Sequence, residues 1–72
     1  MGTPQLRDKV WVPKRAEQDK QPNGYIKRID YDFHEIEVKF EDCEDVEFYD
    51  IDQFDGAEKT IGATTGWWLE DT

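Results

Sequence analysis

The chain has few of the residues that build covalent or metal-bound scaffolds. Cys43 is its only cysteine and His34 its only histidine among 72 residues. One cysteine cannot form a disulfide within the chain, and a structural zinc site needs about four Cys or His ligands. A domain this short buries only about 60% of its unfolded surface, so stability must come from its apolar core or from association. We expect no metal and no cofactor.

Long apolar runs are also absent. The longest uncharged run in the second half, residues 60–69, is rich in glycine and threonine and predicts no membrane span. Residues 1–7 lack the apolar core of a signal peptide and are expected to be flexible. These features predict a cytoplasmic protein, with no membrane attachment, that forms one domain over residues 8–72.

Catalytic patterns are missing from the sequence. It has no glycine-rich phosphate loop, no Ser-His-Asp set on a plausible scaffold and no metal-ligand cluster. Carboxylates are plentiful, but nothing marks a pair with divergent pKa values in a cleft. His34 lies close to Asp30 and Asp32 in the sequence and is expected to be an ordinary surface residue. We therefore expect a protein that is not an enzyme.

Charge is unevenly distributed along the chain. Residues 1–29 hold seven basic and three acidic residues, a net charge of +4. Residues 30–72 hold two basic and fifteen acidic residues, a net charge of −13, which makes the whole chain −9. Such an acidic segment repels phosphate backbones and favours basic partners, so nucleic acid is not the expected partner. Acids on the wet faces of strands would also serve solubility alone.

Alternation of apolar and polar residues is the strongest pattern in the chain. It runs through residues 34–41 and resumes in residues 45–50, after a tight break at 42–44. A period of two is typical of strands with one buried face. The expected core residues are Ile26, Ile36, Val38, Phe40, Val46 and Phe48.

Three further elements complete the predicted fold. Pro13 ends a first strand at residues 9–13, because proline cannot donate to a strand ladder. A second strand covers residues 25–30 and a last strand covers residues 64–70. Residues 50–54 predict a short 3-10 turn, since Asp can cap it. The polar loop at 14–23 and a linker marked by Gly56 and Gly62 join these elements.

This order of elements resembles the Tudor-type and related SH3-like small barrels over residues 8–55. The matching segments are Val10-Trp11-Val12, Gly24-Tyr25-Ile26, Ile36-Glu37-Val38-Lys39-Phe40-Glu41-Asp42, Val46-Glu47-Phe48 and Ile51-Asp52-Gln53-Phe54. The resemblance implies an all-β fold: a small, five-stranded antiparallel barrel with a short 3-10 turn. The last strand, at 64–70, would complete the barrel.

The resemblance also implies a kind of binding site. Tudor domains that bind methylated lysine or arginine use an aromatic cage and an acid, with cation–π attraction of about 0.5–2 kcal/mol per contact. The positions of this chain that match are Trp11, Tyr31, Phe33, Phe40 and Asp42.

Trp67-Trp68 is the second informative feature of the sequence. Adjacent residues of a strand point to opposite faces, so one ring can lie in the core while the other faces outward. The outward ring is either covered by the 14–23 loop or serves as an anchor at an interface. Trp11 points away from Val10 and Val12, and either packs under the C-terminal segment or belongs to a binding surface.

We interpret the chain as a binding module that engages a basic protein or peptide through an aromatic and acidic surface, as a monomer or weak homodimer. An acidic inhibitor or nucleic-acid mimic of the phage or mobile-element type is the alternative, and nucleic-acid binding by the basic first third is a lesser one. The residues expected to contact the partner are Trp11, Tyr25, Tyr31, Phe33, Asp42, Trp67 and Trp68.

Overall fold

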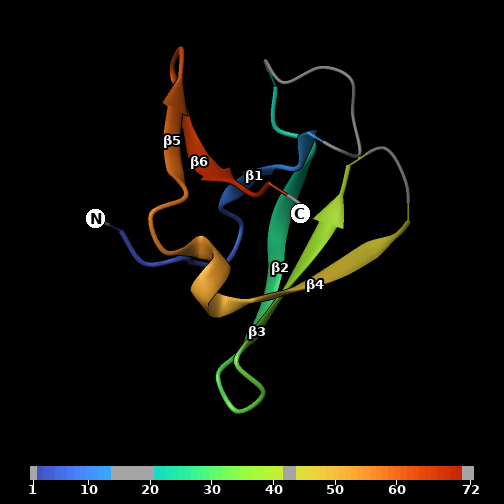
Figure 1. Cartoon of the computed structure of the whole chain (residues 1–72). Coiled ribbons are helices and arrows are strands. Elements are labelled where there is room, and N and C mark those ends of the chain that lie inside the picture. The colour runs from blue at the N-terminus through green and yellow to red at the C-terminus, as the bar shows by residue number, and fades with distance from the viewer. Residues whose placement is uncertain (1, 14–20, 42–43, 71–72) are drawn as a thin grey trace.

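The computed structural model describes residues 2–13, 21–41 and 44–70, which form one twisted and curved sheet (Figure 1). The elements are β1 (Lys9–Trp11), β2 (Gly24–Asp30), β3 (Glu35–Phe40), β4 (Val46–Asp50), the 3-10 helix η2 (Ile51–Phe54), β5 (Glu58–Ile61) and β6 (Thr64–Trp68). The strand order is β4-β3-β2-β1-β6-β5. Within the described residues, no helix has the length and apolar character needed to cross a membrane.

The prediction of a closed five-stranded antiparallel barrel is wrong, although the all-β class is confirmed. The sheet has six strands, is open with β4 and β5 at its edges, and is mixed because β1 runs parallel to β6. β5 lies in the segment that was expected to be a linker. The residues of β5 are almost all exposed, so an apolar alternation that would reveal the strand is lacking.

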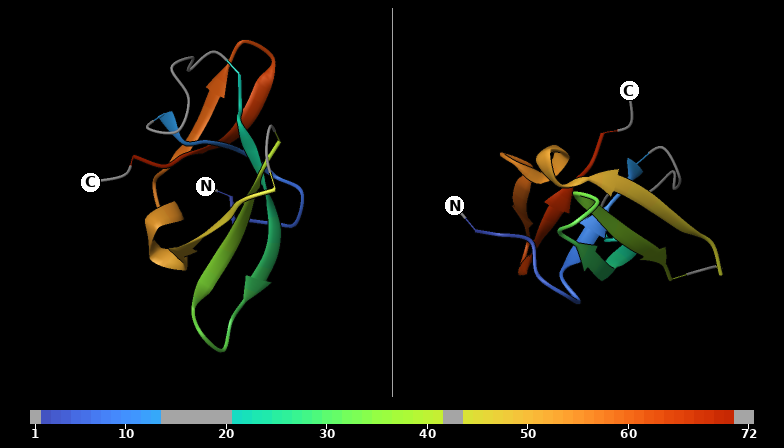
Figure 2. Two further views of the ribbon diagram at one scale, coloured as in Figure 1. Left: turned by 90° about the vertical axis from the view of Figure 1, so that its right-hand side faces the viewer. Right: turned by 90° about the horizontal axis from the view of Figure 1, so that it is seen from below.

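The parallel pairing of β1 with β6 joins two antiparallel parts of the sheet. In this pairing Val10 lies opposite Trp67 and Trp11 lies opposite Trp68. The N–H of Leu69 then donates to the carbonyl oxygen of Trp11 at 2.9 Å. The β2–β3 turn and the β5–β6 turn project at opposite ends of the molecule (Figures 1 and 2).

Asn23 extends the pairing of β1 beyond its last residue. Its side-chain oxygen accepts from the N–H of Val12 at 2.8 Å, and its side-chain nitrogen donates to the carbonyl oxygen of Val12 at 3.0 Å. An amide side chain can reproduce both bonds of a neighbouring strand because it carries one acceptor and two donors. This pair satisfies the buried backbone of Val12 where the ladder with β2 ends.

The inner face of the sheet carries the apolar core, and η2 packs against it. Phe54 of η2 meets Trp67 edge to face, with ring centroids 5.7 Å apart. Such a geometry is favoured because the positive edge of one ring meets the negative face of the other. The buried core cluster consists of Val10, Val12, Ile26, Ile36, Val38, Phe40, Tyr49, Phe54, Trp67 and Leu69.

Val46 and Phe48 were expected in this core, and both expectations are wrong. The register pairs Val38 with Glu47 and Ile36 with Tyr49, so alternate residues of β4 place Tyr49 on the inner face and Phe48 on the outer one. Tyr49 is 8% exposed, whereas Phe48 is 57% exposed. A shift of one residue in the register exchanges the two faces of a strand. Since Phe48 and Tyr49 are adjacent and both aromatic, the sequence of β4 does not show which of them faces the core.

Gly66 permits the close approach of β6 to β1, and its substitution tests this. A Cβ atom at this position would collide with the carbonyl oxygen of Lys9 and lie 2.9 Å from Cζ3 of Trp11. We expect Gly66→Ala to destabilise the fold by about 1–3 kcal/mol in urea unfolding, as overpacking does. The control is Thr65→Ala at the exposed neighbouring position, which removes only the hydroxyl contact with Thr60 and should cost about 0.2–1 kcal/mol. Equal stability of Gly66→Ala and the wild type would contradict the close approach.

Candidate functional site

Trp11 and Trp68 form a second aromatic cluster on the face of the sheet opposite the core. Their ring centroids lie 6.3 Å apart, and the Lys59 ammonium lies 4.4 Å from the Trp68 centroid. Trp11 is 1% exposed, and its indole N–H is buried with no hydrogen-bond partner among the described residues. Trp11 thus packs under β6, while Trp68 is half-buried and covered on one face by a cation.

Trp67 lies inside the core, as one of the two adjacent tryptophans must. Its indole N–H donates to a carboxylate oxygen of Asp8 at 3.0 Å, and the same oxygen accepts from the N–H of Gln5. These bonds attach the N-terminal segment to β6. Trp67 and Trp11, both expected to contact a partner, are therefore inaccessible in this fold.

Tyr31 and Phe33 project from the β2–β3 turn and are 70% and 77% exposed. Asp30 organises this turn, because one of its carboxylate oxygens accepts from the N–H groups of Asp32 and Phe33 at 3.0 and 3.1 Å. His34 closes the turn with φ at 59°, in the left-handed region. The two rings are thus presented to solvent by a turn with its own internal hydrogen bonds.

The residues implied by the Tudor resemblance do not come together around an open cage. Phe40 is buried in the core, as is Trp11 under β6, so neither ring is open to a ligand. Tyr31 and Phe33 lie at the distant hairpin turn. Asp42, also expected at the partner surface, lies outside the described residues, as do residues 14–20 of the loop expected to cover a tryptophan.

The outer face of β2, β3 and β4 combines an exposed ring with carboxylates. One row across the three strands is Arg28, Glu37 and Phe48. The next row is entirely acidic and consists of Asp30, Glu35 and Asp50. Sequence reasoning missed Phe48 as a surface residue, although the second apolar phase of β4, through Tyr49 and Ile51, was visible in the sequence.

Cations reduce the negative charge of this face in part. The Arg28 guanidinium lies 2.8 Å from the Asp30 carboxylate, and the Lys27 ammonium lies 3.7 Å from that of Glu37. Within the described part of the chain, no cation lies within 4.0 Å of Glu35. The row next to Phe48 therefore keeps a net negative charge.

The free edge of β4 borders a hollow beside Phe48. This hollow has a volume of about 480 Å³ and is lined by Val46, Glu47, Phe48, Tyr49 and Gln53. The Tyr49 hydroxyl donates to the Glu47 carboxylate at 2.7 Å, which places that carboxylate at the edge. We refer to β4, its outward side chains and this hollow as the β4 edge surface.

His34, Asp50 and Asp52 form a cluster at the start of η2. Nδ1 of His34 lies 3.1 Å from an Asp50 oxygen, and its Nε2 lies 3.7 Å from Asp52. The pKa of the Asp50 carboxyl is lowered chiefly by the hydrogen bond that it accepts from the N–H of Asp52. The nearby His34 lowers it further. Ligand atoms of the three residues lie within 4.8 Å of one another, as a metal site requires. All three are exposed, and the capping of η2 explains their arrangement.

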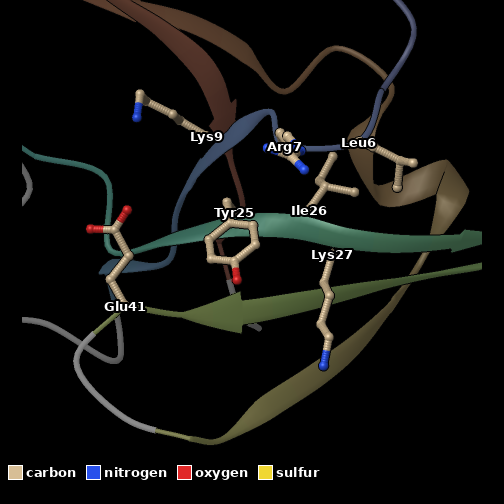
Figure 3. A pocket seen from close by; sticks show the side chains of 7 residues that line it. All are labelled: Leu6, Arg7, Lys9, Tyr25, Ile26, Lys27 and Glu41. Carbon is tan, nitrogen blue, oxygen red and sulfur yellow. The ribbon is translucent and has the colours of Figure 1, made fainter.

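Basic residues gather along a groove between the N-terminal segment and β2 (Figure 3). The groove has a volume of about 580 Å³. Arg7 and Lys9 line it together with Lys27 and the half-buried ring of Tyr25. The lining residues are Leu6, Arg7, Lys9, Tyr25, Ile26, Lys27 and Glu41.

Comparisons with known protein families, with curated proteins and with solved structures found no match to this chain. The function must therefore be argued from the surfaces of the molecule itself. Two of them differ in charge: the acidic β4 edge surface with Phe48, and the basic groove along β2.

The charge of Asp50 at the N-cap of η2 gives a pH-dependent test. A carboxyl whose pKa is lowered on folding stabilises the fold above its ordinary pKa of about 3.9, and this contribution is lost as pH falls through the lowered value. We expect Asp50→Asn to lower Tm at pH 7, and the two melting curves to converge in acid. Asn keeps the capping hydrogen bond and removes the charge.

The matched control for this test is Asp55→Asn, at the C-terminal end of η2. No side-chain hydrogen bond or ion pair involves Asp55 within the described part of the chain, so its loss should leave the pH dependence of Tm unchanged. Thermal unfolding followed by circular dichroism, in steps from neutral to acidic pH, measures both variants. A Tm difference for Asp50→Asn that is constant with pH would contradict the role of the charge.

Proposed function

We propose that the chain is a non-enzymatic binding module that holds a basic peptide, or a basic segment of a protein, on the β4 edge surface. One observation carries this proposal: Phe48 is 57% exposed on a strand with an open edge, beside Glu37 and the acidic row. The anchor therefore differs from the tryptophans expected from the sequence, while the expected combination of aromatic and acidic side chains is retained.

Burial and charge would act together at this surface. Phe48 is 57% exposed, so a partner that covers it completely gains about half of the roughly 1.5–3 kcal/mol that full burial of such a side chain is worth. Exposed aromatic rings also lose little conformational entropy when they become ordered. Carboxylates around the ring favour lysine and arginine, raise the association rate and make binding weaken with salt.

The alternative of a nucleic-acid mimic has less support from the same face. Its acidic row contains only Asp30, Glu35 and Asp50, because the neighbouring rows include Arg28 and Lys39. A mimic needs many carboxylates in one stripe at phosphate spacing, and cations inside the stripe weaken that likeness. The mimic remains a hypothesis that ranks behind basic-peptide binding.

The expected compartment and oligomeric state belong to the same proposal. A lone cysteine, Cys43, suits a reducing compartment, so we place the protein in the cytoplasm. The net charge of −9 opposes close association of identical copies, which favours a monomer over a stable homodimer.

The role of Phe48 can be measured with a fluorescein-labelled octapeptide of alternating lysine and valine. We expect Phe48→Ala to weaken binding of this peptide about tenfold, a loss of about 1.4 kcal/mol, in fluorescence anisotropy titrations. Tm should change little, because the ring lies outside the core.

Leu6→Ala is the control for that measurement, since Leu6 is 59% exposed but lines the basic groove. It should bind the peptide as the wild type does, and an octapeptide of alternating glutamate and valine should not bind. Failure of the wild type to bind the lysine peptide at low salt would reject the proposed function. Equal losses in both variants would remove Phe48 as the anchor.

The basic groove along β2 supports nucleic-acid binding as a second candidate function. Arg7, Lys9 and Lys27 line it beside the ring of Tyr25, and cations with an aromatic platform suit single-stranded nucleic acid. The net charge of −9 opposes this function, because phosphate neutralisation supplies most of such affinity.

A charge reversal in the groove tests this second candidate. If wild-type protein binds labelled oligothymidine at about 50 mM salt, Lys9→Glu should abolish that binding, because phosphate contacts dominate it. Thr60→Glu, an exposed position on β5 away from the groove, is the control. An absence of wild-type binding at this low salt would end the nucleic-acid hypothesis.

A further inference from the structure

The hydrogen-bond ladder between β3 and β4 shows which backbone groups of β4 are free. In an antiparallel pair, residue pairs that exchange hydrogen bonds alternate with pairs that do not. At one end of the ladder the N–H of Phe40 donates to the carbonyl oxygen of Asp45. At the other end the N–H of Ile51 donates to the carbonyl oxygen of His34. Both bonded pairs continue the register of the two strands. Because Asp45 and Ile51 are an even number of residues apart, both pairs assign hydrogen bonds with β3 to the same alternate residues of β4.

This alternation turns the backbone of β4 in a defined way. Glu47 and Tyr49 belong to bonded pairs and direct their N–H and C=O groups toward β3. Val46 and Phe48 belong to the intervening pairs and direct theirs away from β3, where β4 is the edge of the sheet. The third outward N–H, that of Asp50, donates to the side chain of Gln53 in the capping box.

We propose that the basic partner binds as an added β-strand, paired with the outward backbone groups of Val46 and Phe48. This inference rests on the proposed function and specifies its geometry. An extended peptide that joins a sheet edge gains affinity from main-chain hydrogen bonds and specificity from alternate side chains. The hollow of about 480 Å³ beside Val46 and Phe48 lies along this edge.

The side chains of the edge favour a basic strand over a second copy of this chain. Asp50 lies on the face of β4 that carries Phe48 and Glu47 on the face that carries Tyr49, so lysine or arginine on either face of an added strand would be near a carboxylate. Pairing β4 with β4 of another copy in the register centred on Glu47 would instead place the two Glu47 carboxylates opposite one another. Like charges that face each other across strands are destabilising, so the edge selects against self-association while remaining open to cations.

The other edge strand, β5, shows how this protein covers an edge. Lys59 of β5 extends over the Trp68 ring, and an edge lysine is a common protection against strand addition. β4 has neither lysine nor proline, and it exposes Phe48 instead. The two edges thus differ in the feature that decides whether a further strand can pair.

Amide hydrogen exchange measured by NMR, with and without the lysine-valine octapeptide, tests the added strand directly. In the free protein the amides of Val46 and Phe48 should exchange rapidly, and those of Glu47 and Tyr49 should be protected. Saturation with peptide should slow the exchange of Phe48 by about tenfold or more, because a new hydrogen bond must open before exchange. Thr60 on β5 serves as the internal reference and should not change.

The outcomes separate this inference from the function on which it rests. If the peptide binds and the Phe48 amide still exchanges rapidly at saturation, the added strand is wrong, while basic-peptide binding stands. If wild-type protein does not bind the peptide, the proposed function fails and this inference fails with it. Protection of Thr60 together with Phe48 would show general tightening of the fold, and would also overturn strand addition at β4.

Proline substitutions at the two edges provide a second test. Val46→Pro removes an outward N–H, which an edge strand tolerates, so the variant should fold and bind the octapeptide about tenfold more weakly. Thr60→Pro on β5 is the matched control and should fold and bind normally. Unchanged binding by a folded Val46→Pro would count against pairing at that residue, and the exchange of Phe48 decides the matter if Val46→Pro does not fold.

Discussion

The pairing of β1 with β6 is the contact on which the rest of the sheet depends. β1 has only three residues, yet it lies near the middle of the sheet and connects an antiparallel group of β2, β3 and β4 with the β5–β6 hairpin. Gly66 makes the pairing possible because it lets the two backbones approach. On the other side of β1, Asn23 extends the pairing with the β2 segment through hydrogen bonds to Val12. Packing on both faces of β1 follows from this arrangement, with Val10 in the core and Trp11 against Trp68.

The properties of the β4 edge surface depend mainly on which alternate residues of β4 face the core. β4 has two possible inner faces, and the core takes Tyr49, which leaves Phe48 in water. The same register turns the backbone of Phe48 toward the open edge. One choice of register therefore exposes an aromatic ring, frees its main-chain groups and sets both beside carboxylates. No separate feature is needed to bring these three properties together.

The sequence predicted several strands of the sheet but not the pairing that joins its two antiparallel parts. The alternation in residues 34–41 and the opposite faces of Trp67 and Trp68 were visible, because a period of two depends only on neighbouring residues. The parallel contact of β1 with β6 joins residues almost sixty positions apart, and a local pattern contains no information on it. β5 was missed because its exposed residues carry no apolar alternation, and Phe48 was misplaced because each phase of β4 contains an aromatic residue. The candidate site could not be predicted without that register.

The pairing of β1 with β6 also determines when this fold can be completed on a ribosome. Strands β1 to β4 emerge first, but β1 lacks its second neighbour until residues 66–68 have left the exit tunnel. Until then the Trp11 ring has no Trp68 to pack against, and the core lacks Trp67. Contacts between distant residues slow folding because a long loop must close first. Completion of the sheet therefore waits for β6, and until then the nascent chain presents an aromatic surface that the complete sheet conceals.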